Sequence, residues 1–222
     1  MLRDAALVAG KDLRLELRSR VGLGQVAPFA LLVLVLFGVA LDPDRGVLDD
    51  ATPGLFWVAV LFSATLAVQR SWSVESADGA RDNLRLSGLS PGGIFLGKAA
   101  AVAAQLVALE AVLLVGVAVL YGARLDGWAL VVATMAPATV AVAAVGSLYG
   151  VLAMGLRVRE TLLPLLVLPV LAPVLIAATQ AFEAALTGTP SEGWPWAGLL
   201  ALLALGYTAT GVAAYGPLLE DT

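Results

Sequence analysis

Residues 99–120 read AAAVAAQLVALEAVLLVGVAVL, and Gln105 and Glu110 are the only strongly polar side chains in this stretch. A helix of this length extends roughly 33 Å at 1.5 Å per residue. That length matches the roughly 30 Å hydrocarbon core of a bilayer. The apolar residues are continuous and do not alternate with a period of two, which excludes a strand of a membrane β-barrel. The stretch therefore predicts a transmembrane helix.

Five other stretches have the same character. The six predicted spans are residues 21–41, 52–68, 99–120, 128–156, 161–181 and 194–215. Over the 222 residues, 60% are hydrophobic, 14% are charged and the mean hydropathy is +0.92. A soluble domain contains roughly 45–50% apolar and roughly 25% charged residues, so a soluble globule is excluded, and so is a disordered chain. The composition predicts an all-α integral membrane protein with a single domain, residues 1–222.

The basic residues give the orientation of these spans. Eleven of the 13 would lie on one side of the membrane if the six spans are correct, and only Arg45 and Arg124 would lie on the other. The eleven are Arg3, Lys11, Arg14, Arg18, Arg20, Arg70, Arg81, Arg85, Lys98, Arg157 and Arg159. The positive-inside rule places this side in the cytoplasm, together with both termini.

Residues 1–20 are charged but carry an apolar stripe at helical spacing. The stripe consists of Leu2, Ala6, Ala9, Leu13 and Leu17. Most of the cations lie off this face, which predicts an amphipathic helix in the cytoplasmic interface with its cations toward lipid headgroups. The alternative is a plain orientation signal with no docking role.

The longest polar segment, residues 69–98, reads QRSWSVESADGARDNLRLSGLSPGGIFLGK. A cytoplasmic loop of this size and mixed charge is either a docking site for a soluble partner or a solvated connector. Residues 92–98 match the first seven positions of the phosphate-binding loop G-x-x-x-x-G-K-[ST], but Ala99 replaces the hydroxyl residue that would contact Mg²⁺. No predicted strand precedes the motif. We therefore interpret residues 87–93 as a turn and Lys98 as the cytoplasmic anchor of the third span.

Polar and proline residues inside the spans are further candidates for function. Glu110 lies near the middle of its span, where a charged group is costly and often functional. It shares a face only loosely with Gln105, and the alternative is a neutral carboxyl bonded to a neighbouring helix. Pro164, Pro169 and Pro173 predict a bent or broken fifth span. The segment 180–194 that follows is either an external re-entrant element or a surface loop.

The residue types that are missing exclude several kinds of chemistry. The sequence has no Cys and no His, which excludes disulfides, Cys/His zinc sites, His-based catalytic triads and haem ligation by either residue. Metal-protease and serine-hydrolase motifs are absent as well, so no catalytic residue is predicted. The net charge of −4 gives no reason to expect a nucleic-acid partner.

Four segments together resemble one known family. They are the amphipathic start KDLRLELRSR, the second span TPGLFWVAVLFSATLAVQRSW, the loop ESADGARDNLRLSGLSPGGIFLGKAA and the fifth-span run LVLPVLAPVLIAATQAFEAA. The chain resembles the haem exporter protein B family nearly end to end. The most specific parts are Asp78-Gly79 through Leu89-Ser90-Pro91, Lys98, and the run from Pro169 to Pro173.

The resemblance implies an exporter-type ABC permease of cytochrome c maturation in the inner membrane of a prokaryote. The implied partners are a separate ATPase subunit that binds ATP and Mg²⁺, a second copy of the chain, further maturation subunits and a haem chaperone. Haem would be the substrate of the complex, and we expect no cofactor to be held tightly by this chain. The residues implied to couple the chain to the ATPase are Asp78, Gly79, Arg81, Leu89, Ser90 and Pro91.

Two other functions remain open at this level. One is a scaffold that assembles the maturation complex without transport. The other is a stand-alone membrane carrier or enzyme that uses Glu110. Activity of the isolated chain that is lost on Glu110→Gln would favour the second of these.

Overall fold

The computed structural model describes residues 1–19, 24, 26–41, 46–76, 88–123, 127–154 and 159–221, and the ordered elements within them are helices. They are α1 (Leu2–Ser19), α2 (Ala27–Ala40), α3 (Val47–Ser76), α5 (Pro91–Leu120), α6 (Trp128–Met154), α7 (Arg159–Leu186) and α8 (Pro190–Asp221). The protein is an all-α integral membrane protein, as the sequence predicts.

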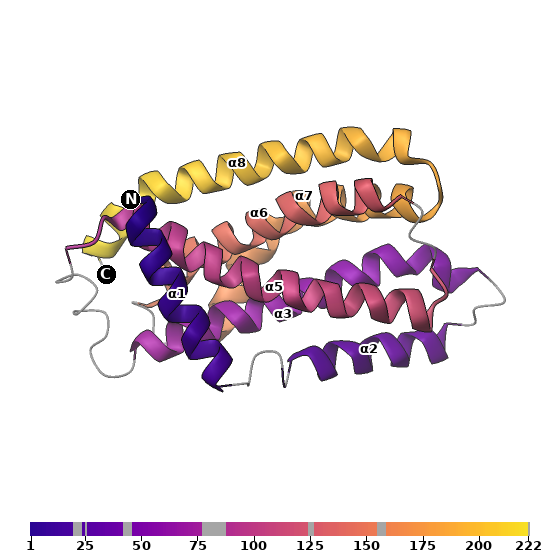
Figure 1. The fold of residues 1–222 in the computed structure, drawn as a ribbon, viewed down its shortest axis with the longest axis horizontal. Helices are drawn as coiled ribbons and strands as arrows, with labels where there is room; N and C mark the ends of the chain where they lie inside the picture. Colours follow the sequence, from indigo (N-terminus) through magenta and orange to yellow (C-terminus); the bar gives the residue numbers. More distant parts are fainter. Residues whose placement is uncertain are drawn as a thin grey trace.

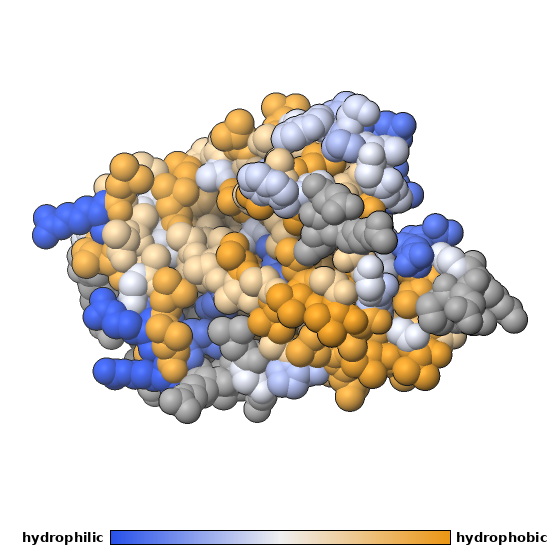
Figure 2. Space-filling view, turned by 45° about the vertical axis from the view of Figure 1, so that its right-hand side comes forward, coloured by the Kyte–Doolittle hydropathy of each residue, from blue (hydrophilic) through white to orange (hydrophobic). Residues whose placement is uncertain are grey.

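Five of the described helices are long and apolar enough to cross a membrane, namely α3, α5, α6, α7 and α8. The sixth candidate, α2, has 14 described residues, or roughly 21 Å of helix. Part of the predicted span 21–41 lies outside the described residues, so the six-span count and the orientation remain predictions. Figure 2 shows hydrophobic side chains spread over the middle of one face, with hydrophilic ones gathered toward its left and right ends.

The spanning helices form a bundle in which α6 packs against α3, α5, α7 and α8. In Figure 1, α8 and α2 lie at opposite edges, while α1 crosses the first part of α5. Both termini lie at the same end of the bundle, beside the start of α5. Small residues allow close packing: a Cβ at Gly146 of α6 would lie 2.5 Å from Val68 of α3. Gly146 therefore serves the close packing of α6 on α3 within the chain.

Residues 180–194 form no separate element. They complete α7, make a short turn and begin α8, and Gly188 ends α7 with a φ of +76°. The Thr189 amide donates to the carbonyl of Ala184, which is the bond of a Schellman ending, and Pro190 then starts α8. Nor do the prolines break α7, which continues through Pro164, Pro169 and Pro173. Tyr207 of α8 donates to the Val170 carbonyl beside Pro169, at 2.8 Å.

Candidate coupling site

Two glycines let α1 lie directly on the start of α5. A Cβ on Gly97 would lie 2.6 Å from the Cβ of Val8 and 2.7 Å from the carbonyl oxygen of Ala5. On Gly93 it would lie 2.8 Å from the Cβ of Asp4. Side chains larger than hydrogen would push the two helices apart, so Gly93 and Gly97 form a small-residue docking surface for α1. This contact explains the glycines of the partial phosphate-loop motif without any nucleotide.

The first polar contact of this interface joins Asp4 to the beginning of α5. The Asp4 carboxylate accepts a 2.7 Å hydrogen bond from the Ser90 hydroxyl and a 3.2 Å bond from the Ser90 amide. The Ser90 hydroxyl makes no capping bond to its own helix. Its hydrogen bonds to Asp4 are the main reason why the pKa of this carboxyl is held below its usual value. Asp4 therefore binds α5 as a carboxylate.

The second polar contact joins Asp12 to Lys98. The Lys98 Nζ lies 3.3 Å from Oδ2 of Asp12, and Lys11 lies on the other carboxylate oxygen at 3.0 Å. Lys98 is only 1% exposed, although it belongs to the third turn of α5. The role of Lys98 as the cytoplasmic anchor of the third span remains a prediction. Its side chain is turned into the α1–α5 interface, where the acidic side chain of Asp12 meets it.

The end of α8 closes the same junction from another side. Gly211 has no side chain, and a Cβ there would collide with the ring of Phe95. Phe95 also packs on Tyr215, with ring centroids 5.6 Å apart. A Cβ on Gly92 would contact both Met1 and Val212. We call this meeting of α1, the start of α5 and the end of α8 the three-helix junction; its core is residues 1–12, 89–98 and 211–216.

The face of α1 that packs on α5 differs from the predicted apolar stripe. The packed face carries Asp4, Ala5, Val8 and Asp12, whereas Leu2 and Leu17 of the stripe are 82% and 70% exposed. The outward face combines such leucines with the exposed cations Arg3, Lys11, Arg14 and Arg18. That combination suits a membrane surface, so the interfacial location of α1 remains a prediction that this geometry favours.

Within the bundle, Glu110 is paired with α6. Its side chain is 1% exposed, and the Thr139 hydroxyl lies 2.7 and 2.8 Å from its two carboxyl oxygens. Gln105 is half-buried on the same helix. The observed partner of Glu110 thus corresponds to the alternative in which the carboxyl bonds to a neighbouring helix. This contact links the middle of α5 to α6.

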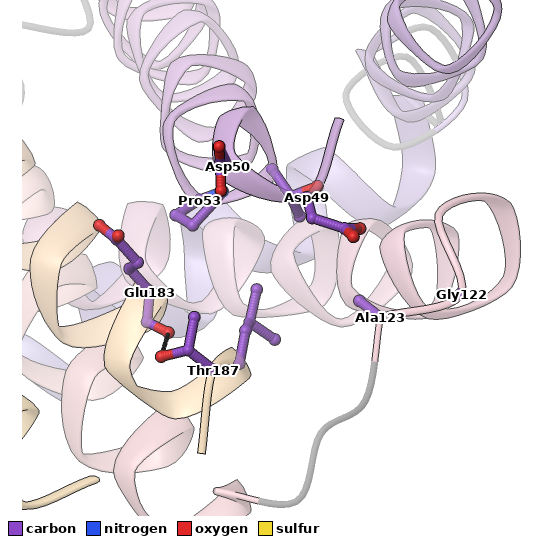
Figure 3. Close-up of a pocket in the computed structure, with 9 residues that line it drawn as sticks. Asp49, Asp50, Pro53, Gly122, Ala123, Glu183 and Thr187 are labelled. Carbon is purple, nitrogen blue, oxygen red and sulfur yellow. Dashed lines mark hydrogen bonds between the residues drawn. The ribbon is translucent and has the colours of Figure 1, made fainter. Parts of the chain in front are cut away.

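A pocket lies at the opposite end of α5, beyond Tyr121. It has a volume of about 360 Å³ and is lined by Asp49, Asp50, Thr52, Pro53, Gly122, Ala123, Glu183, Leu186 and Thr187. Figure 3 shows the three carboxylate residues coming from α3 and α7 around one space. The Thr187 hydroxyl donates to the backbone carbonyl of Glu183 at 2.9 Å. Among the described residues, the lining of this pocket is acidic and includes no cation.

Comparison with known proteins identifies the family to which this chain belongs. The sequence model of the family described as "CcmB protein" matches residues 4–216. The chain belongs to this family. It is similar to "Heme exporter protein B" of Haemophilus influenzae, with 32% identity over 82% of this chain and 83% of that one. The protein of the same name from Pseudomonas aeruginosa is 30% identical over 94% of both chains. That of Escherichia coli K12 is 31% identical over 93% and 90%.

The resemblance seen in the sequence is therefore confirmed, whereas the individual coupling residues are only partly placed. Asp78, Gly79 and Arg81 lie outside the described residues. Leu89, Ser90 and Pro91 stand at the beginning of α5. Helices occupy both ends of the predicted loop 69–98, because α3 continues to Ser76 and α5 begins at Pro91. The predicted turn over 87–93 is wrong from residue 91 onward. Proline at a first helical position is a usual helix start, which the glycines that follow it obscured.

Asp4 and Asp12 are the site residues that sequence reasoning missed. Neither belongs to the apolar stripe or to the cations from which the amphipathic helix is predicted, yet both bond residues at the start of α5. The available signals were their spacing of eight residues, which places them on one helix face, and a Gly-x-x-x-Gly in the segment that begins the third span. Neither signal names the partner helix, because the paired residues are 86 positions apart.

Proposed function

We propose that this chain is the permease subunit of an ABC transporter of cytochrome c maturation in the bacterial inner membrane. Hydrolysis of ATP on a separate subunit would drive either haem export or release of a haem-loaded chaperone through this chain. Membership of the family that contains the heme exporter proteins B carries the proposal. In this proposal, a displacement of residues 69–90 by the ATPase subunit would be transmitted to the helix bundle at the three-helix junction.

The nucleotide and the iron of haem are held elsewhere in this proposal. The glycines and lysine of the partial phosphate-loop motif lie in a helix and are already packed against α1. A haem iron would find neither His nor Cys in the chain. The described residues that line the acidic pocket include neither Met nor Tyr, and their three carboxylates would repel the two carboxylates of haem. We therefore assign ATP hydrolysis and tight haem ligation to partner subunits, with haem as substrate.

The outer surfaces leave room for lipid and for a second copy of the chain. Exposed apolar side chains on α2 include Phe29, Leu32 and Leu36, and on α8 they include Leu202 and Leu205. Such surfaces face lipid or another transmembrane helix in a bilayer. The further maturation subunits and the haem chaperone belong to the proposal through the family.

The test is coexpression with the ATPase subunit encoded in the same organism. The tagged chain should copurify with the ATPase, and ATP-dependent attachment of haem to a reporter cytochrome c should require both. Alteration of Asp78, Gly79 and Arg81 to Ala together should reduce copurification. A chain that stays free of any ATPase while maturation proceeds would exclude the proposal. Continued ATP hydrolysis in the complex, with neither haem movement nor chaperone release, would favour the scaffold.

A further inference from the structure

Two polar contacts tie α1 to α5 with the same offset in sequence. Asp4 bonds Ser90 and Asp12 bonds Lys98, and both pairs are 86 residues apart. The helices thus run in the same direction, with one contact at the first residue before α5 and the other eight residues later. Eight helical residues cover roughly 12 Å. The contacts of Gly93 and Gly97 with α1 lie between the two polar pairs.

This arrangement fixes the register of the two helices. If α1 slid along α5 by one turn, Asp4 would leave Ser90, and the Lys98 charge would lose the Asp12 carboxylate within a buried interface. The loss of a carboxylate partner from a buried charge is strongly unfavourable. A gradual slide is therefore opposed, and α1 is expected to move with α5 as one body.

Stability alone gives a weak reason for a buried lysine at this position. Replacement of a buried ion pair by apolar residues of similar volume is often neutral or stabilising. What apolar residues cannot provide is a defined register, because they pack nearly as well after a shift. Lys98 and Asp12 therefore suit a site that must transmit a displacement rather than merely hold two helices together.

We propose that Asp12 and Lys98 are positioning residues that lock α1 to α5, so that a displacement of the segment before Ser90 moves both helices as one lever. The inference rests on the proposed function, because the displacement would come from ATP hydrolysis on the partner subunit. The lever connects that segment with the outward face of α1 and, through Phe95 and Tyr215, with the end of α8.

The first experiment separates positioning from packing. The double variant Asp12→Leu/Lys98→Met is produced in the complete complex and compared with the native chain for abundance, ATP hydrolysis and haem attachment to a reporter cytochrome c. We expect normal abundance and continued hydrolysis, with haem attachment per ATP reduced about tenfold. A matched control is Arg14→Met, which removes an exposed charge of α1 away from α5 and should leave this ratio unchanged. A double variant that is as abundant and as well coupled as the native chain would overturn the inference.

The second experiment uses a covalent tether and does not depend on comparing abundances. Since the chain has no native cysteine, Asp12→Cys/Lys98→Cys carries two unique thiols. Lysine spans the gap with a long side chain, and the smaller cysteine at position 98 leaves that space open to a reagent. A short bis-thiosulfonate linker is therefore used in place of a direct disulfide. Coupling should be low in the untethered protein, recover on tethering and fall again when reductant cleaves the linker. A tethered complex that still hydrolyses ATP without haem attachment would show that α1 must leave α5, and would refute the lever.

Failure of this inference and failure of the proposed function give different results. If the native chain supports ATP-dependent haem attachment while both altered pairs behave as native, only the role of Asp12 and Lys98 is wrong. If the native chain itself shows no dependence on an ATPase, the proposed function is wrong.

Discussion

At the residue scale, glycines that lack a side chain are as important for the contact between α1 and α5 as the charged pairs. The interface between α1 and α5 exists because Gly93 and Gly97 leave room for Asp4, Ala5 and Val8. Glycine within a helix normally costs about 1 kcal/mol relative to alanine. Here that local cost is outweighed by a close approach of two backbones, which places the acidic residues of α1 within reach of α5.

Gly97→Ala should therefore destabilise the protein, although alanine favours helices. The added Cβ would meet the Cβ of Val8 and the Ala5 carbonyl at less than 3 Å, so α1 must shift. We expect a loss of about 1–3 kcal/mol, the usual range for overpacking, measured by thermal unfolding in detergent. Gly198→Ala in α8 is the control, because nothing lies within 4 Å of its new Cβ. That variant should be neutral or slightly more stable. Equal effects at both sites would contradict the close-contact interpretation.

Acid should release the first polar contact. The folded pKa of Asp4 lies below its usual value of 3.8, because Ser90 bonds the carboxylate. Its contribution to α1 docking is therefore complete above that value and is lost as the pH falls through the lower folded pKa. Docking should not change across neutral and mildly acidic pH. Spin labels on Leu7→Cys and Val107→Cys, both exposed, report the distance between α1 and α5.

The variant Asp4→Asn isolates this effect from the titration of other acids. An asparagine side chain still accepts a bond from Ser90 but does not titrate. The acid-induced change of the label distance should therefore be smaller in Asp4→Asn than in the native background. An identical acid response in both backgrounds would exclude Asp4 as its source.

At the element scale, the sequence predicts a helix well where the apolar residues are continuous. It predicts a helix poorly where contacts with other helices determine whether the segment is helical. The predicted spans 99–120 and 194–215 fall within α5 and α8, and the span predicted from residue 128 begins where α6 begins. A run of apolar residues this long can adopt few structures other than a helix. Residues 91–93 look like the end of a turn, since Pro-Gly-Gly is a turn signal on its own. Their helix is stabilised by α1 and α8, which no local window contains.

The contact between α5 and α6 offers an element-scale prediction. Thr139→Val removes the hydroxyl that bonds Glu110, so the buried carboxyl loses its observed partner. A double-mutant cycle with Glu110→Leu should give a coupling energy of about 0.6–2 kcal/mol, as for other hydrogen bonds between transmembrane helices. Unfolding in detergent provides the measurement. Glu110→Gln keeps an oxygen acceptor and should retain most of the stability and the maturation activity. A Glu110→Gln variant that is stable but inactive would instead favour a carrier built around this carboxyl.

At the scale of the whole molecule, α5 separates two regions of different charge. The three-helix junction, with the cations of α1, lies at its beginning, and the acidic pocket lies beyond its end. Its 30 residues cover roughly 45 Å, more than the roughly 30 Å hydrocarbon core. The length and hydropathy of α5 therefore predict that its ends emerge on opposite sides of the membrane. The count of basic residues predicts which side is which, but the sequence alone does not show that Asp49 and Glu183 meet.

Single cysteines in this cysteine-free chain test that orientation directly. Glu183→Cys and Asp49→Cys at the pocket should react with a membrane-impermeant maleimide in intact spheroplasts, because both residues are exposed and predicted to be external. Arg14→Cys on α1 should react only after the membrane is opened, since the positive-inside rule keeps that helix in the cytoplasm. Ala184→Cys, next to Glu183 but buried, is the control that should stay unlabelled on either side. Reaction of Arg14→Cys from outside, with Glu183→Cys protected, would show that the orientation is the reverse of the predicted one. The three-helix junction would then lie where no ATPase has access to it. Reaction of both from one side would mean that α5 does not cross the bilayer, and the permease interpretation would fail with it.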